Sequence, residues 1–141
     1  MGNNNKYVAG VIAGIVAGLA YGLMMALVGL TPLVAKMIGK ESLTIEWIVN
    51  LVYSAIIGEL FVWWFEKKLV SMEKSVVFGL IHGVIWWILG ALTLRPLIFG
   101  LPLQYGKIFE TYNMMFFLGH LVYGLVLGIV FYKMYSIKQI K

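Results

Sequence analysis

Residues 120–128 read HLVYGLVLG and stand within a largely apolar run over residues 112–133. A bilayer core of roughly 30 Å needs about 20 apolar helical residues to cross it, so this run predicts a membrane-spanning helix. Three more runs meet the same criterion, over residues 7–30, 46–65 and 75–94. We therefore predict an all-α integral membrane four-helix bundle that forms a single domain over residues 1–141.

The composition agrees with a chain that is surrounded by lipid. Hydrophobic residues make up 62% of it and charged residues 12%, whereas a soluble domain keeps about a quarter of its residues charged. Cysteine is absent, which excludes disulfides, thiolate chemistry and Cys-ligated metals. The net charge is +5, but the basic residues do not cluster with stacking aromatic residues, so we expect the bilayer and no nucleic acid as a partner.

The positions of lysine and arginine predict the orientation of the helices, because cytoplasmic segments carry an excess of both. The two ends of the chain and the 66–74 loop hold Lys6, Lys67, Lys68, Lys74, Lys133, Lys138 and Lys141, and the other two loops hold Lys36, Lys40, Arg95 and Lys107. We therefore expect both termini in the cytoplasm and a multi-pass location in the inner or plasma membrane of the cell.

The HLVYGLVLG stretch has a counterpart, NLVYSAIIG, over residues 50–58. A second pair of similar stretches, over residues 30–34 and 94–98, follows the first and the third predicted helix. Two matches in the same order predict a tandem duplication of a two-helix hairpin. The copies would share one orientation, with a pseudo-twofold axis along the membrane normal. Repeat 1 would cover about residues 7–68 and repeat 2 about residues 75–138.

A His-x-x-Tyr-Gly-x-x-x-Gly pattern is formed by His120, Tyr123, Gly124 and Gly128. In this pattern the chain resembles a group of small four-helix inner-membrane proteins of bacteria and archaea. The resemblance covers mostly the third and fourth predicted helices. It implies the four-helix fold and no particular chemistry.

Small residues recur at four-residue spacing on each predicted helix. Lipid gives helices no hydrophobic reason to associate, so they associate through close backbone approach at small residues. We therefore predict a packing face of the glycine-zipper type on every span. The residues are Gly10, Gly14, Gly18 and Gly22 on the first helix, Ser54 and Gly58 on the second, Gly79 and Gly83 on the third, and Gly124 and Gly128 on the fourth.

Polar side chains within the spans form a candidate site, because ionisable groups at membrane depth are costly and usually face the protein interior. In the duplicated arrangement Asn50 and His120 hold equivalent positions and would lie at equal depth. These groups either form interhelical hydrogen bonds or make a binding or proton-relay site. The candidates are Asn50, Glu59, His82 and His120, with Tyr53 and Tyr123 beside the first and the last.

Two pairings of these residues carry a specific chemistry. Glu59 and His82 match in depth on adjacent helices, and a carboxylate beside an imidazole suits proton relay near neutral pH. Glu59 lies about 180° around its helix from Asn50, so the alternatives are that it faces lipid, a partner subunit or the interface. His82 and His120 raise the alternative of bis-His haem b, with a depth difference of roughly 8 Å against it.

These observations leave three functions open. The first is a non-catalytic accessory or structural subunit of a larger membrane complex, such as a respiratory one, because the chain is small and its chemistry is not concentrated. The second is a homo-oligomeric small transporter or channel with an intramembrane Glu/His relay. The third is a haem b-binding electron carrier. No nucleophile–base pair and no metal-ligand cluster emerges, so we expect no catalytic residues, no metal and otherwise no cofactor.

Overall fold

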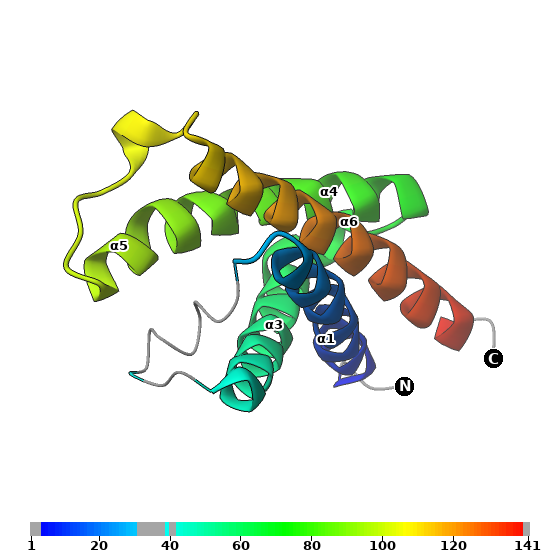
Figure 1. The fold of residues 1–141 in the computed structure, drawn as a ribbon. Helices are drawn as coiled ribbons and strands as arrows, with labels where there is room; N and C mark the ends of the chain where they lie inside the picture. Colours follow the sequence, from blue (N-terminus) through cyan, green and yellow to red (C-terminus); the bar gives the residue numbers. More distant parts are fainter. Residues whose placement is uncertain (1–3, 31–38, 40–41, 140–141) are drawn as a thin grey trace.

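The computed structural model describes residues 4–30, 39 and 42–139, and in this part the chain is all-helical (Figure 1). Side chains are described for residues 5–30, 39 and 42–135. The longer helices are α1 (Asn4–Leu27), α3 (Leu43–Phe65), α4 (Met72–Trp86) and α6 (Thr111–Gln139). The shorter elements are the 3-10 turns η1 (Glu66–Lys68) and η3 (Tyr105–Lys107), the π-helical segment η2 (Trp87–Leu94) and α5 (Arg95–Ile98).

Within the described residues, four helical segments are long and apolar enough to cross a membrane, which confirms the four predicted spans and indicates a multi-pass membrane protein. The main difference from the prediction is the third span, which continues beyond residue 94 to Ile98. The segments are Asn5–Leu27, Leu43–Lys68, Met72–Ile98 and Thr111–Tyr135.

The third span continues through Pro96 because its hydrogen bonds change register before the proline. In η2 the main-chain N–H of Arg95 bonds five residues back rather than four. In this register the carbonyl of Ala91 would accept from the N–H at position 96, which proline lacks. The side-chain Nε of Arg95 donates to that carbonyl instead, at 3.2 Å. The next carbonyl, of Leu92, accepts from the N–H of Gln104 at 3.1 Å, so the loop after α5 folds back onto the helix.

The helices pack as two antiparallel hairpins, α1 with α3 and α4 with α6 (Figure 1). The hairpins join along α1 and α6, which pack extensively against each other. The outer helices, α3 and α4, are connected by η1 but have few contacts, mainly through aromatic side chains. The spatial order is therefore α3, α1, α6, α4.

Both hairpins make their closest contacts at glycines. A Cβ added to Gly58 of α3 would lie 2.7 Å from the Cα of Gly14, and one added to Gly128 of α6 would lie 2.9 Å from the Cα of Val76. These are main-chain neighbours, so a larger residue would have to push the helices apart. Glycine at these positions lets the two backbones of each hairpin approach closely.

The two hairpin interfaces are built alike. Gly14 of α1 lies against residues 54–58 of α3, and Gly79 of α4 lies against residues 124–128 of α6. The sequence match pairs residues 50–58 with 120–128, so similar segments make similar contacts in the two hairpins.

A second row of small residues on α1 faces the other hairpin. Ala9, Ala13 and Ala17 are completely buried beside the glycine row. They belong to the largest core cluster, to which α6 contributes Tyr123, Leu127 and Phe131. Two adjacent rows of small residues thus allow α1 to lie between α3 and α6.

Candidate binding cavity

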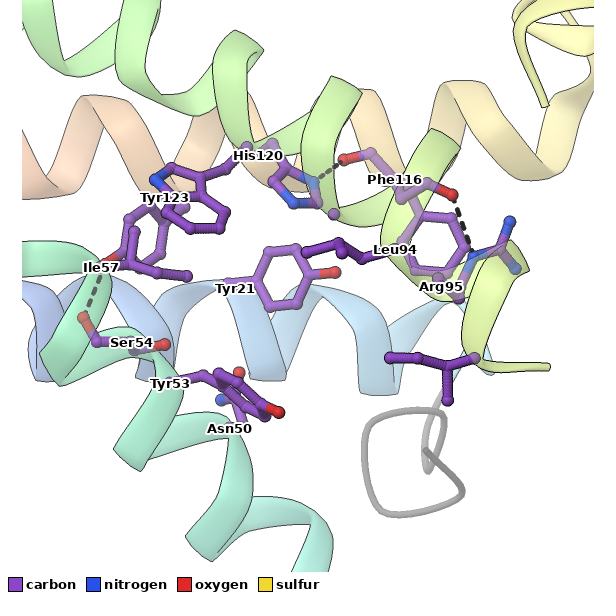
Figure 2. Close-up of a pocket in the computed structure, with 14 residues that line it drawn as sticks. Tyr21, Asn50, Tyr53, Ser54, Ile57, Leu94, Arg95, Phe116, His120 and Tyr123 are labelled. Atoms are coloured by element: carbon purple, nitrogen blue, oxygen red, sulfur yellow. Dashed lines mark hydrogen bonds between the residues drawn. The ribbon is translucent and has the colours of Figure 1, made fainter. Parts of the chain in front are cut away.

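A cavity of ≈ 200 Å³ lies between the two hairpins (Figure 2). Its wall is formed by residues of α1, α3, α4, η2, α5 and α6. Most of the wall is apolar, as is typical of sites for small molecules. Three residues that line the cavity, Tyr53, Leu94 and Ile98, are themselves 45%, 46% and 51% exposed. The mouth of the cavity therefore lies between α3 and the end of the third span.

Four of the six predicted polar residues line this cavity: Asn50 and Tyr53 from α3, and His120 and Tyr123 from α6 (Figure 2). The equivalent positions 50 and 120 thus face one cavity from the two hairpins. The structure gives these residues two different roles, because some of their polar atoms bond neighbouring helices and others face the cavity.

Asn50 and Tyr123 each join two helices. The side-chain N–H of Asn50 donates to the carbonyl of Gly18 on α1 at 2.9 Å. The hydroxyl of Tyr123 donates to the carbonyl of Ser54 on α3 at 2.8 Å. Both are interhelical hydrogen bonds, which is one of the two roles that we considered for these polar residues.

His120 presents a hydrogen-bond acceptor to the cavity. Its Nδ1 lies 2.7 Å from the carbonyl oxygen of Phe116, which can only accept, so Nδ1 carries the proton in the neutral ring. Nε2 is then an acceptor, and it has no hydrogen-bond partner among the described residues. A Cβ built on Gly90 across the cavity would lie 3.9 Å from Nε2. A ligand with a donor group can bind there.

Tyr21 of α1 fills the centre of the wall. Its ring meets the ring of His120 edge-on, with the centroids 5.3 Å apart. The ring lies between His120 and Arg95, and its hydroxyl is directed to the end of the cavity at which Arg95 lies (Figure 2). Tyr21 thus adds a further polar group to a wall that is mostly apolar.

The sequence prediction missed two polar residues of this site, Tyr21 and Arg95, and it missed Arg95 because that residue was assigned to a loop. Arg95 lines the cavity and is only 9% exposed. Its Nη1 donates to the hydroxyl of Tyr112 at 2.7 Å, and its Nη2 to Oδ1 of Asn113 at 3.4 Å. The guanidinium also lies over the rings of Tyr112 and Phe116, at 4.6 Å and 4.9 Å from their centroids. The available signal was an arginine directly before a proline at the end of an apolar span.

His82 lies outside the cavity and is completely buried in an aromatic cluster. Its Nε2 is 3.0 Å from the carbonyl of Ile57 and 3.1 Å from the indole N–H of Trp86. One ring nitrogen cannot donate to a carbonyl and accept from an N–H at once, so only one of the two hydrogen bonds exists in either tautomer. The rings around the imidazole belong to Phe61, Trp64, Phe65 and Trp86.

The structure does not bring the predicted pairs together. Glu59 is exposed on the surface of α3, and no hydrogen bond between the described residues joins it to His82. His82 and His120 do not share a cavity, since only His120 lines the one between the hairpins. The polar residues Asn50, Tyr21, Arg95 and His120 instead line the cavity together.

In the described part of the chain, no group of three or more His, Cys, Asp or Glu residues is placed to hold a metal ion. No protein-family model, no curated protein and no solved structure matches this chain.

Proposed function

We propose that this protein binds a small, largely apolar molecule that enters from the bilayer between α3 and the third span. The observation that carries the proposal is the cavity between the hairpins, in whose mostly apolar wall Nε2 of His120 is an acceptor without a hydrogen-bond partner among the described residues. A mostly apolar cavity with a few convergent polar groups is the usual form of a ligand site.

The size of the cavity limits what can enter it. Its ≈ 200 Å³ is smaller than the roughly 300–1,000 Å³ of pockets for drug-sized ligands. It exceeds the roughly 150 Å³ of an engineered apolar cavity that holds benzene. One ring or a short stretch of alkyl chain fits inside, and a longer chain would extend through the mouth into lipid.

The π-helical segment supports a functional role for this wall of the cavity. Such segments are rare and occur frequently at functional sites. Here η2 contributes Gly90, Ala91 and Leu94 to the cavity. Arg95 follows η2 directly, and its side chain turns back to donate to the carbonyl of Ala91 in that segment.

Filling the cavity tests the proposal. In Gly90→Leu the new side chain would point towards His120, and an added Cβ meets no atom closer than 3.9 Å, so the fold should tolerate it. Gly106→Leu is the matched control, because open space surrounds Gly106 outside the cavity. Native mass spectrometry with added decan-1-ol should show a bound adduct on the wild type and on Gly106→Leu only. Equal adducts on Gly90→Leu would contradict the proposal.

A transporter would use the same cavity, and binding is the step that it shares with the proposed function. The path would then pass Asn50 and His120, which line the cavity, rather than Glu59 and His82, which do not. Uptake of a bound compound into liposomes, blocked by Gly90→Leu, would extend the proposal from binding to transport.

A role as an accessory subunit of a larger membrane complex is a second proposal. It is supported by the outer helices, because 28% of the apolar window is buried in α3 and in the third span, against 44% in α1 and 39% in α6. A neighbouring subunit could cover these surfaces. In a mild detergent, a particle with stoichiometric larger subunits would support this role, and a chain that is stable alone would contradict it.

The haem-binding carrier remains a prediction with a simple test. A Soret band in the purified protein would support it, and a colourless protein from haem-replete cells would contradict it. The separate surroundings of His82 and His120 give it no additional support.

We also propose that both termini lie in the cytoplasm, in the inner or plasma membrane, and that the hairpins arose by duplication of one two-helix unit. The distribution of lysine and arginine supports the orientation. The matching contacts of Gly14 and Gly79 support the duplication and a glycine-zipper type of packing within each hairpin.

A further inference from the structure

Arg95 is a buried cation in the wall of the cavity. The residue is 9% exposed, and none of the ion pairs between described residues includes it. A buried charge is costly unless it is paired, so an oxyanion beside this guanidinium would be stabilised.

The guanidinium also has hydrogen-bond donors to spare. It donates to the carbonyl of Ala91, the hydroxyl of Tyr112 and the side-chain oxygen of Asn113. A guanidinium has five N–H groups, so about two remain without a partner in the described part of the chain. The three bonds fix its orientation, and a fixed fork of donors suits an oxyanion.

Arg95 lies where the head group of a molecule aligned with the third span would be. It is close to Ile98, the last residue of that span, where the polar part of a bilayer molecule would lie. The cavity extends from Arg95 past Tyr21 to Ile57 and Tyr123, further along the spans (Figure 2). A charged group thus stands at one end of a mostly apolar cavity.

We propose that Arg95 binds the acidic head group, a carboxylate or a phosphate, of a single-chain amphiphile whose apolar part occupies the cavity. The inference deepens the proposed function and rests on it. Carboxylate and phosphate oxygens accept bidentate hydrogen bonds from a guanidinium. The hydroxyl of Tyr21 is directed to the same end of the cavity and can donate to the same group (Figure 2).

A series of ligands with equal chains tests the charge preference on the unmodified protein. Decanoic acid, decyl phosphate, decan-1-ol and decylamine would be titrated in a neutral detergent, with the micellar partition of each compound measured separately. We expect an acid to bind about tenfold or more tightly than the alcohol, because hydrogen bonds to charged groups are the stronger ones. The carboxylate and phosphate arms distinguish a fatty acid from a phosphate lipid. Equal binding of acids and alcohol, or tightest binding of the amine, would overturn the assignment.

Two variants connect the preference to Arg95. Arg95→Gln removes the charge and should bring acid and alcohol to nearly equal affinity. Because that variant also loses buried hydrogen bonds, Leu94→Glu is the second, in which Arg95 stays and a carboxylate is added to the cavity wall. It should bind the alcohol and lose the acids. Its control is Leu97→Glu, at a side chain that is 59% exposed and outside the cavity, where the preference should persist.

The outcomes separate this inference from the function on which it rests. Binding of the alcohol that Gly90→Leu abolishes, without preference for acids, retains the cavity as a site and overturns the role of Arg95. A preference for acids that persists in Leu94→Glu also overturns it. If none of the compounds binds, the proposed function fails, and the assignment of Arg95 fails with it.

Discussion

The hydroxyl of Tyr123 donates a hydrogen bond of 2.8 Å to the main-chain carbonyl of Ser54 and so joins α6 to α3. Both residues line the cavity. The bond links the two hairpins at the inner end of the site, although the outer helices α3 and α4 have few contacts of their own.

Tyr123→Phe should lower the free energy of unfolding by about 0.5–1.5 kcal/mol, because it removes one buried hydrogen bond and little volume. Tyr53→Phe is the control, since Tyr53 is 45% exposed and its hydroxyl forms no hydrogen bond with another described residue. Unfolding in mixed SDS micelles would measure both variants. Equal stability of Tyr123→Phe and the wild type would show that the bond does not hold the hairpins together.

Gly58→Ala should destabilise the fold strongly, although it adds only one methyl group. The added Cβ would lie 2.7 Å from the Cα of Gly14, and overpacking of this kind costs about 1–3 kcal/mol. Gly106→Ala is the matched control, because no atom lies within 4 Å of an added Cβ there. The same unfolding measurement compares the two, and a Gly58→Ala protein as stable as the control would contradict the close packing of α1 and α3.

Asn113→Leu should release the loop between α5 and α6. Asn113 is completely buried and donates to the carbonyl of Lys107 at 2.8 Å, while its Oδ1 accepts from Arg95. Loss of these bonds should speed tryptic cleavage after Lys107, measured as the rate of appearance of the C-terminal fragment. An unchanged rate would mean that other contacts hold the loop.

The two histidines should differ in their effect on ligand binding. His120→Ala removes the acceptor that faces the cavity and should weaken binding of a hydroxyl ligand about fivefold or more, as expected for one lost hydrogen bond. His82→Phe places a ring in an aromatic cluster outside the cavity, so binding should stay within about twofold of the wild type. Titration with decan-1-ol measures both, and a loss of binding in His82→Phe alone would reverse these roles.

Single cysteines can report the orientation, because the chain has none of its own. We expect Gly106→Cys to react with an impermeant maleimide added to intact cells, and Lys68→Cys to react only after the cells are opened. The reverse pattern would contradict cytoplasmic termini.

The four spans could be predicted from the sequence because length and hydropathy alone determine which segments can cross a bilayer. The glycines that make the closest contacts could be recognised by their spacing, since close approach in lipid requires small residues. The arrangement of the two hairpins could not be predicted from the sequence, because every span has both a small-residue face and an apolar face. The spatial order depends on the second row of small residues, at Ala9, Ala13 and Ala17.

The candidate site could be predicted in part, because polar residues within apolar spans can be recognised in the sequence. Asn50 and His120 stood out as polar residues within apolar spans, and both line the cavity. Arg95 did not, because Pro96 normally marks the end of a helix, and its position in the wall depends on the change of register in η2. Glu59 stood out equally, yet it is exposed on α3, since polarity alone does not show which way a side chain points.

The most direct test of the cavity as a ligand site is to identify what the protein carries from its own membrane. The wild type, Gly90→Leu and Gly106→Leu would be purified under the same conditions, and the small molecules released on denaturation would be measured by mass spectrometry. We predict one compound in stoichiometric amount with the wild type and Gly106→Leu that is missing from Gly90→Leu. The same set of lipids from all three proteins would contradict the account.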